Sequence, residues 1–284
     1  KLTMWLVLAA AWKDRAEGWS RLRKMGSLAG LLRLALVPVS LAFAASPKVY
    51  PPIDRTTGGP TGSSLQGSAM IVIGLMLLLP RVAAVCMDTK RKPGIWIFFA
   101  LSWIVFGVTE AMGGTHHDPH QIFSMLFLLP WIWWLPKDWK RFKWPDGSAV
   151  WRWAMFGWWG MLVVTSLAMY KVGILDRIKF TQGLVAHSHL AMTGFTTSFC
   201  ALLLVLLTGR RMGGNLSVVG WHAAAFGMIN TLAVMGWCEG ANPSWMSSQP
   251  LWREAGLVIR AVFGAVMWAA SVDWLRTACS RPSQ

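Results

Sequence analysis

Apolar residues along this chain occur in blocks of about 20, separated by short polar or basic stretches. A block of that length can cross a bilayer as an α-helix, because the helix satisfies its own backbone hydrogen bonds. Membrane β-strands would instead alternate every second residue over about ten residues. The pattern therefore predicts an all-α polytopic membrane protein with about eight transmembrane helices, at 26–45, 63–80, 94–112, 121–136, 150–170, 182–208, 216–238 and 254–276.

The chain reads as a single transmembrane domain over residues 1–284, since no internal repeat or low-complexity segment interrupts it. Residues 1–25 combine an apolar run too short to span a bilayer with a basic segment. We interpret them as a partial helix followed by a cytoplasmic stretch. The helical bundle then occupies 26–276, and 277–284 form a tail.

The composition supports a membrane protein and argues against a nucleic-acid partner. Hydrophobic residues make up 55% of the chain and charged residues 14%, against about 25% charged residues in soluble domains. Many of the 20 tryptophans lie at block edges, as in the aromatic belts of membrane proteins. The net charge of +15 comes from lysines and arginines in alternate connections rather than along one patch, so it reflects membrane topology.

The basic residues also predict an orientation. Residues 13–25 contain five Lys or Arg, whereas 81–93 and 137–149 contain four each. Residues 113–120 and 239–252 contain none. Because cytoplasmic connections are enriched in Lys and Arg, the C-terminus is expected in the cytoplasm and 113–120 at the outer face. A bacterial inner membrane fits this pattern.

Five of the six histidines fall in two clusters. The first is Gly113-Gly114-Thr115-His116-His117-Asp118-Pro119-His120, and the second is Val185-Ala186-His187-Ser188-His189-Leu190. In the predicted topology, the helix at 94–112 ends at the outer face and the helix at 182–208 begins there. Two clusters about 70 residues apart are therefore expected at one membrane depth, near the outer face.

Spacing distinguishes the two pairs. His116 and His117 are adjacent, about 100° apart around a helix, so both can turn toward one metal ion. His187 and His189 are two residues apart, about 200° around a helix, so they face opposite sides and serve two different sites. Interface loops for the first pair and helix–helix hydrogen bonding for the second remain structural alternatives.

Two further polar residues lie within apolar blocks. Glu110 precedes His117 by two helical turns on nearly the same face. A carboxylate at that depth is costly unless it is paired, bound to a metal or protonated. His222 stands alone, and we interpret it as a hydrogen-bonding residue between helices.

Trp103–Pro130, with Gly114-Thr115-His116-His117 inside it, resembles the catalytic subunit of heme–copper oxidases. C-type oxidases and their nitric oxide reductase relatives are the most similar branch. Phe180-Thr181 before His187-Ser188-His189 resembles the family's tenth helix, and Trp221-His222 and Arg260 resemble parts of the last two. The resemblance covers roughly residues 60–280, and the blocks would correspond to helices five to twelve of the family's twelve.

The resemblance implies ligands and cofactors for the candidate residues. His187 looks like the proximal ligand of the high-spin heme b, and His189 like a ligand of the low-spin heme. His116 and His117 look like two ligands of the distal copper or non-heme iron. Glu110 stands where C-type oxidases carry a redox-active tyrosine, which makes it the candidate catalytic residue.

Two family ligands have no counterpart. The family's sixth helix supplies a third distal-metal histidine, but residues 60–80 contain no histidine. The second-helix ligand of the low-spin heme is also missing. The resemblance therefore implies a shortened or split heme-binding oxidoreductase subunit of a respiratory electron-transfer complex. Partner membrane subunits would supply the N-terminal helices, and a cytochrome c is a candidate electron donor.

Two other functions remain open from the sequence. The chain could be a degenerate, cofactor-poor accessory or structural subunit of a larger membrane complex. It could also be a metal-handling transporter whose histidines bind copper or zinc, although the broken helices and paired half-repeats typical of transporters are not evident.

Overall fold

The computed structural model describes residues 62–83, 85–86, 93–114, 117–170 and 173–279, and a few single positions between 20 and 39. The chain divides into two compact units, residues 1–144 and 145–284. The predicted terminal segments and the predicted helix at 26–45 lie largely outside the described residues, and His116 lies outside them. The single-domain interpretation stays a prediction.

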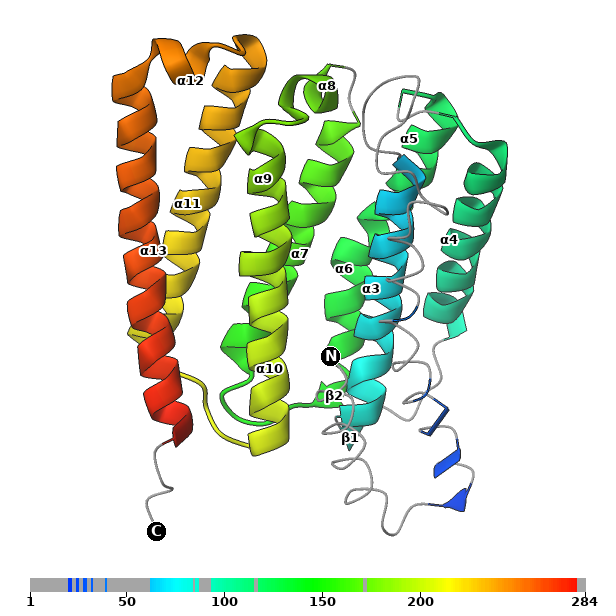
Figure 1. Ribbon diagram of the computed structural model, residues 1–284. Coiled ribbons are helices and arrows are strands. Elements are labelled where there is room, and N and C mark those ends of the chain that lie inside the picture. The colour runs from blue at the N-terminus through cyan, green and yellow to red at the C-terminus, as the bar shows by residue number, and fades with distance from the viewer. Residues whose placement is uncertain are drawn as a thin grey trace. The chain divides into compact units, whose positions relative to one another are not determined.

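The first unit consists of helices around a tryptophan-rich core. Its elements are α3 (Gly62–Ala83), α4 (Pro93–Met112), α5 (Pro119–Leu126), α6 (Leu129–Trp139) and a short antiparallel strand pair, β1 (Val85–Cys86) with β2 (Phe142–Lys143). Helix α3 packs against α4 and α6, and α4 packs against α5 (Figure 1). Trp131 and Trp139 are buried, and the indole of Trp139 donates to the carbonyl of Met76 at 2.8 Å.

The helix expected at 121–136 is two helices in the structure. Helix α5 ends at Leu126, and α6 begins at Leu129 after the turn at Phe127 and Leu128. Pro130 lies in the first turn of α6. A proline has no amide hydrogen for the preceding turn but is tolerated where a helix begins, which explains the break.

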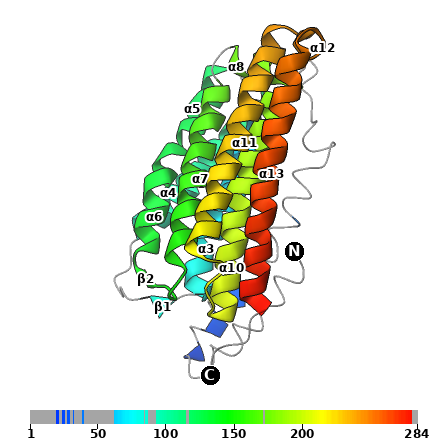
Figure 2. The same cartoon turned by 90° about the vertical axis from the view of Figure 1, so that its left-hand side faces the viewer.

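The second unit is a bundle of long helices with short connecting helices. Its elements are α7 (Ala149–Met169), α8 (Ile174–Ile178), α9 (Gln182–His189), the π-helix η1 (Leu190–Thr196), α10 (Thr197–Thr208), α11 (Asn215–Ala241), α12 (Trp245–Ser248) and α13 (Pro250–Cys279). Helices α11 and α13 lie side by side in both ribbon views, and α11 also packs against α9 (Figures 1 and 2). Helix α7 packs against η1 and α10.

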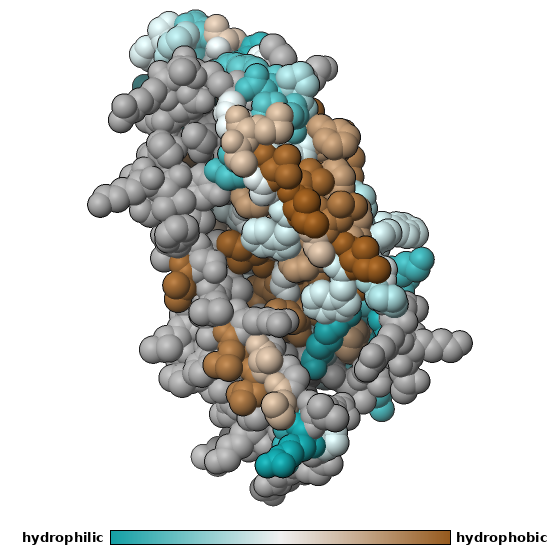
Figure 3. Space-filling model, turned by 90° about the vertical axis from the view of Figure 1, so that its right-hand side faces the viewer, coloured by the Kyte–Doolittle hydropathy of each residue, from teal (hydrophilic) through white to brown (hydrophobic). Residues whose placement is uncertain are grey.

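Four helices among the described residues are long and apolar enough to cross a membrane: 93–112, 182–208, 215–241 and 250–277. On α4, the exposed side chains Ile97, Leu101, Ile104 and Val108 recur at helical spacing and form an apolar stripe. Figure 3 shows hydrophobic side chains gathered on this side of the first unit, with hydrophilic ones toward its ends. These features agree with the predicted all-α membrane protein.

The predicted orientation can be tested at two exposed positions. In a cysteine-free background, Asp146→Cys is expected to react with a membrane-impermeant maleimide only from the cytoplasmic side, because 137–149 is rich in Lys and Arg. Ser247→Cys, in a connection without basic residues, is expected to react only from the outer side. The reverse pattern, or labelling of both from one side, would contradict the orientation.

Candidate functional site

His187 lies on α9 and faces α7. Helix α9 begins after Thr181, whose side chain accepts a hydrogen bond from the amide of Gly183 at 3.1 Å. Such an N-cap fixes the start of the helix and therefore the direction of the residues that follow. The Nδ1 atom of His187 lies 3.2 Å from the hydroxyl of Thr165, and its Nε2 atom lies 3.5 Å from the hydroxyl of Ser166.

The neighbours of Thr165 favour one tautomer of His187. The Thr165 hydroxyl donates to the carbonyl of Met161 at 2.8 Å, with the Leu162 carbonyl at 3.2 Å. Its oxygen is then left to accept from Nδ1 of His187, and Nε2 keeps a lone pair that the Ser166 hydroxyl approaches at 3.5 Å. Metal-binding histidines use this arrangement, in which one ring nitrogen donates to an oxygen and the other binds the metal.

His187 also lines a cavity of about 230 Å³ between α7, α8, α9 and α11. Among the described residues that line it, His187 is the only titratable one and the remainder are mostly apolar. They are Thr165, Ala168, Met169, Ile174, Ile178, Gly183, Ala186, Leu190, Ile229, Ala233 and Trp237. A neutral nitrogen base beside an apolar cavity is suited to an uncharged or metal-containing group.

His189 has a different environment. Its Nδ1 atom lies 2.9 Å from the carbonyl of Val185 in the preceding turn of the same helix. A carbonyl can only accept, so Nδ1 donates and Nε2 again keeps the lone pair. His187 thus lies against α7, whereas His189 is bonded to its own helix. That the two serve different sites stays a prediction.

His222 on α11 has the opposite tautomer. The indole of Trp158 on α7 donates to its Nδ1 atom at 3.0 Å, so the ring proton resides on Nε2. That nitrogen is buried and has no hydrogen-bond partner among the described residues. The interpretation of His222 as a hydrogen-bonding residue between helices is confirmed, and its protonated Nε2 is not available to bind a metal.

The π-helix η1 follows His189 directly and was not predicted. The hydroxyls of Thr196 and Thr197 bond to carbonyls five residues earlier, those of Ala191 and Met192. The indole of Trp221 donates to another η1 carbonyl, that of Thr193, at 3.3 Å. Single π-turns inside α-helices occur frequently at functional sites. The residues that could have indicated this π-helix are Thr193, Gly194, Thr196 and Thr197, which follow His189 closely.

In the first unit, Glu110 lies near the end of α4 and its Oε2 atom is buried, with no hydrogen-bond partner among the described residues. Beyond α4, the carbonyl of Gly113 lies 2.8 Å from Nε2 of His120 and accepts from the side-chain Nε2 of Gln121 at 2.9 Å. A buried carboxylate oxygen without a partner is costly. Glu110 therefore remains a candidate functional residue.

A metal site at the first histidine cluster stays a prediction. His117 is half-buried, but His116 lies outside the described residues. Within the described ranges, no group of three His, Cys, Asp or Glu side chains could hold a metal ion. The first cluster belongs to the first unit and His187 and His189 belong to the second, so their expected convergence also stays a prediction.

Comparisons with protein-family models, curated proteins and solved structures give no match for this chain. The similarity to heme–copper oxidases therefore rests on the residues quoted above.

Glu239 is a structural carboxylate that the sequence analysis missed. It lies near the end of α11 and accepts a hydrogen bond from the amide of Gln182, the first residue of α9, at 2.6 Å. The first amides of a helix have no partner within it, and the positive end of the helix dipole favours a negative charge there. Glu239 therefore fixes the beginning of the helix that carries His187.

Removal of this charge is expected to destabilise the protein modestly. Glu239→Gln should lower the free energy of unfolding by about 1 kcal/mol, because the charge-assisted bond to α9 becomes a neutral one. Thermal unfolding in detergent measures the effect. Glu254→Gln is the matched control, since Glu254 is largely exposed beside Arg253, and its replacement should change stability little. Equal effects of both replacements would contradict the role of Glu239.

Proposed function

We propose that this protein is a heme-binding membrane subunit of a respiratory-type electron-transfer complex, with His187 as an axial ligand of the heme. The observation that carries the proposal is the orientation of His187: its Nδ1 lies 3.2 Å from the Thr165 hydroxyl, which favours Nε2, with Ser166 at 3.5 Å, as the nitrogen that would bind iron. The resemblance of the sequence around His187 and His189 to heme–copper oxidases points to the same chemistry.

The residue types around His187 suit a ligand of heme iron, but the cavity beside His187 is too small to enclose a heme. A neutral imidazole held by a hydroxyl and surrounded by apolar side chains is a suitable iron ligand. The cavity of about 230 Å³ is smaller than the roughly 300–1,000 Å³ of pockets that enclose drug-sized ligands. A heme bound to His187 would need covering groups beyond this cavity, which agrees with the partner subunits that the resemblance implies.

Each residue has a distinct role in this proposal. When bound, the heme would supply one-electron redox chemistry. Thr165 would hold the imidazole in the tautomer with the proton on Nδ1, and the mostly apolar cavity would exclude water beside His187. His189 would bind a second, low-spin heme if another chain provides the opposing ligand.

The outer-face cluster belongs to the same proposal. His116 and His117 would hold copper or non-heme iron, with Glu110 as the carboxylate beside them. About eight spanning helices, a cytoplasmic C-terminus and a bacterial inner membrane complete it.

A cofactor-poor accessory subunit is the second candidate. It is favoured by the small cavity beside His187. In that case His187 and His189 would act as hydrogen-bonding residues within the bundle.

A visible absorption spectrum distinguishes the two. The protein, purified in detergent with its co-purifying subunits, is expected to show the bands of a b-type heme when reduced with dithionite and compared with the oxidised sample. A colourless preparation would contradict the proposal and leave the accessory function.

A further inference from the structure

Arg260 is a positive charge inside an apolar stretch of α13. It is the only charged residue between Glu254 and Asp273, and its side chain is half-buried. It forms no hydrogen bond or ion pair with any residue that the structure describes. A charged side chain within a membrane span is costly unless it is paired, so an unpaired one marks a functional position.

Contacts with α11 place Arg260 deep within the span. Phe263 packs against Gly227, and Gly256 packs against Met235, so α11 and α13 run antiparallel. Because Arg260 lies between these two contacts, it is level with the middle of the 27-residue helix α11, about 16 Å from the nearer end of that helix. An arginine near the end of a span can extend its charge to the interface, whereas one at this depth needs an anionic partner.

The carboxylates on α11 and α13 are bound to other groups. On α13, Glu254 binds Arg253, and Asp273 accepts hydrogen bonds from residues at the start of α11. On α11, Glu239 accepts a hydrogen bond from the first amide of α9. None of the three carboxylates described on these two helices therefore neutralises Arg260.

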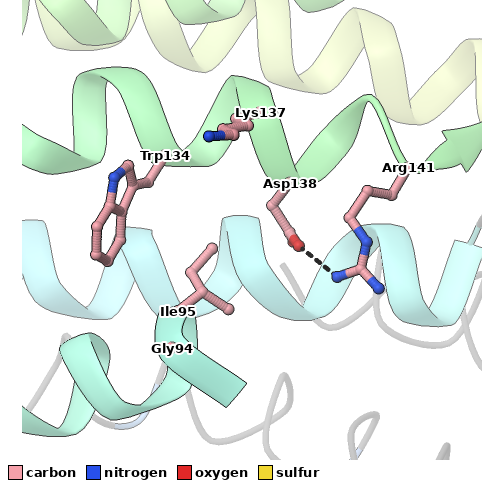
Figure 4. Close-up of a pocket in the computed structure, with 6 residues that line it drawn as sticks. All are labelled: Gly94, Ile95, Trp134, Lys137, Asp138 and Arg141. Atoms are coloured by element: carbon pink, nitrogen blue, oxygen red, sulfur yellow. Dashed lines mark hydrogen bonds and ion pairs between the residues drawn. The ribbon is translucent and has the colours of Figure 1, made fainter. Parts of the chain in front are cut away.

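Two arginines of the first unit show the pairing that Arg260 lacks. Arg141 binds Asp138 at 3.2 Å beside the cavity shown in Figure 4, and Arg81 binds the same carboxylate at 2.8 Å. These two arginines lie at the ends of α3 and α6, where water is close, and each still has a carboxylate partner. Arg260 lies deeper in its span and is expected to need a carboxylate as well.

The surface of α13 beside Arg260 is suited to contact with another helix. Leu257 and Trp268 are 43% and 71% exposed and lie on the same side of α13 as Arg260. Between them, a Cβ atom on Gly264 would meet no atom within 4 Å. Small residues allow the backbones of membrane helices to approach closely. We call this surface, formed by Leu257, Arg260, Gly264 and Trp268, the Arg260 face.

We propose that the Arg260 face binds a transmembrane helix of a different subunit, and that this helix carries an aspartate or glutamate paired with Arg260. Charge complementarity carries the proposal, because ionisable groups within a span are stabilised by pairing with one another. In a second copy of this chain, the described carboxylates lie in connections or toward helix ends, as Glu110 does on α4, and not at this depth. The interface goes beyond the proposed heme chemistry and does not depend on it.

Photo-crosslinking of the full chain in its native membrane tests the proposal, with p-benzoylphenylalanine in place of Leu257. We expect an adduct with a second protein, and mass spectrometry of the adduct should give an apolar span of about 20 residues that contains Asp or Glu. Arg260→Gln should reduce this adduct at least about tenfold, because loss of one partner of a buried charge pair costs more than one tenfold step in affinity. Arg260→Lys retains the charge and should retain most of the adduct.

Two controls separate binding of the partner from folding of the chain. The crosslinker at Val262, an exposed position about 200° around the helix from Arg260, should not give this adduct. Gly264→Leu should remove the adduct formed from position 257, because the added side chain occupies the surface that the partner helix needs. Since that side chain begins in open space, thermal unfolding of the purified chain should change little.

Four results would overturn the proposal. The first is an adduct with lipid alone or no adduct. The second is a crosslink within this chain or to a second copy of it. The third is a partner span without Asp or Glu. The fourth is an adduct that persists undiminished in Arg260→Gln.

Discussion

His187→Ala is expected to abolish the carbon monoxide-sensitive heme signal of the purified protein and to leave its helical content unchanged. A five-coordinate heme depends on a single protein bond to iron, and alanine removes that ligand. The replacement also removes the hydrogen bond to Thr165, which costs about 0.6 kcal/mol between membrane helices and does not unfold a bundle of this size. Carbon monoxide difference spectra and circular dichroism measure the two quantities.

Two matched replacements separate ligation from packing. His189→Ala should leave the carbon monoxide signal and reduce a low-spin heme signal. His222→Ala should change neither spectrum, because Trp158 holds His222 in the tautomer that cannot bind iron through Nε2. Its loss should cost about 0.6 kcal/mol of stability, the average for a hydrogen bond between membrane helices. Identical spectra for all three variants would contradict the assignment of His187.

Gly236→Ala is expected to disrupt the packing of α11 against α9 and to lower the free energy of unfolding by about 3 kcal/mol. A Cβ atom at Gly236 would collide with the backbone nitrogen and Cα of Gly183. Backbone atoms cannot rotate away as a side chain can, so the helices would have to separate. The contact lies at the start of α9, where Glu239 binds the amide of Gln182.

Gly264→Ala is expected to raise the free energy of unfolding rather than lower it. A Cβ atom at Gly264 in α13 would meet no atom within 4 Å. Alanine in a helix interior is more stable than glycine by about 0.5–1 kcal/mol, so this variant should be slightly more stable. Thermal unfolding of both variants in detergent measures the difference. Equal stability of the two would show that the close approach of Gly236 and Gly183 is not required.

The sequence predicted most of the described helices because their apolar blocks have the length of a membrane span. The expected block at 182–208 corresponds to one continuous helical path, α9 through α10. The turn at Phe127 and Leu128 was not evident, since the apolar run continues through it. The π-helix was not evident either, because hydropathy does not distinguish hydrogen bonds to the fourth residue from those to the fifth.

The sequence indicated which histidines are candidate ligands, but it did not indicate which ring nitrogen of each carries the proton. The spacing of His187 and His189 indicated separate environments, but their tautomers depend on Thr165 and Val185, which only the packed structure brings to them. Glu239 was missed because its partner is the backbone of a distant helix. A single carboxylate near a helix end carries no sequence signal for such a contact.

The proposed bond between His187 and heme iron has a direct spectroscopic signature. Resonance Raman spectroscopy of the reduced wild-type protein is expected to show an iron–histidine stretching band that shifts on substitution of the iron isotope. The band should be absent from His187→Ala and present in His222→Ala. A wild-type protein without heme, or a band that persists in His187→Ala, would contradict the assignment of His187 as the axial ligand.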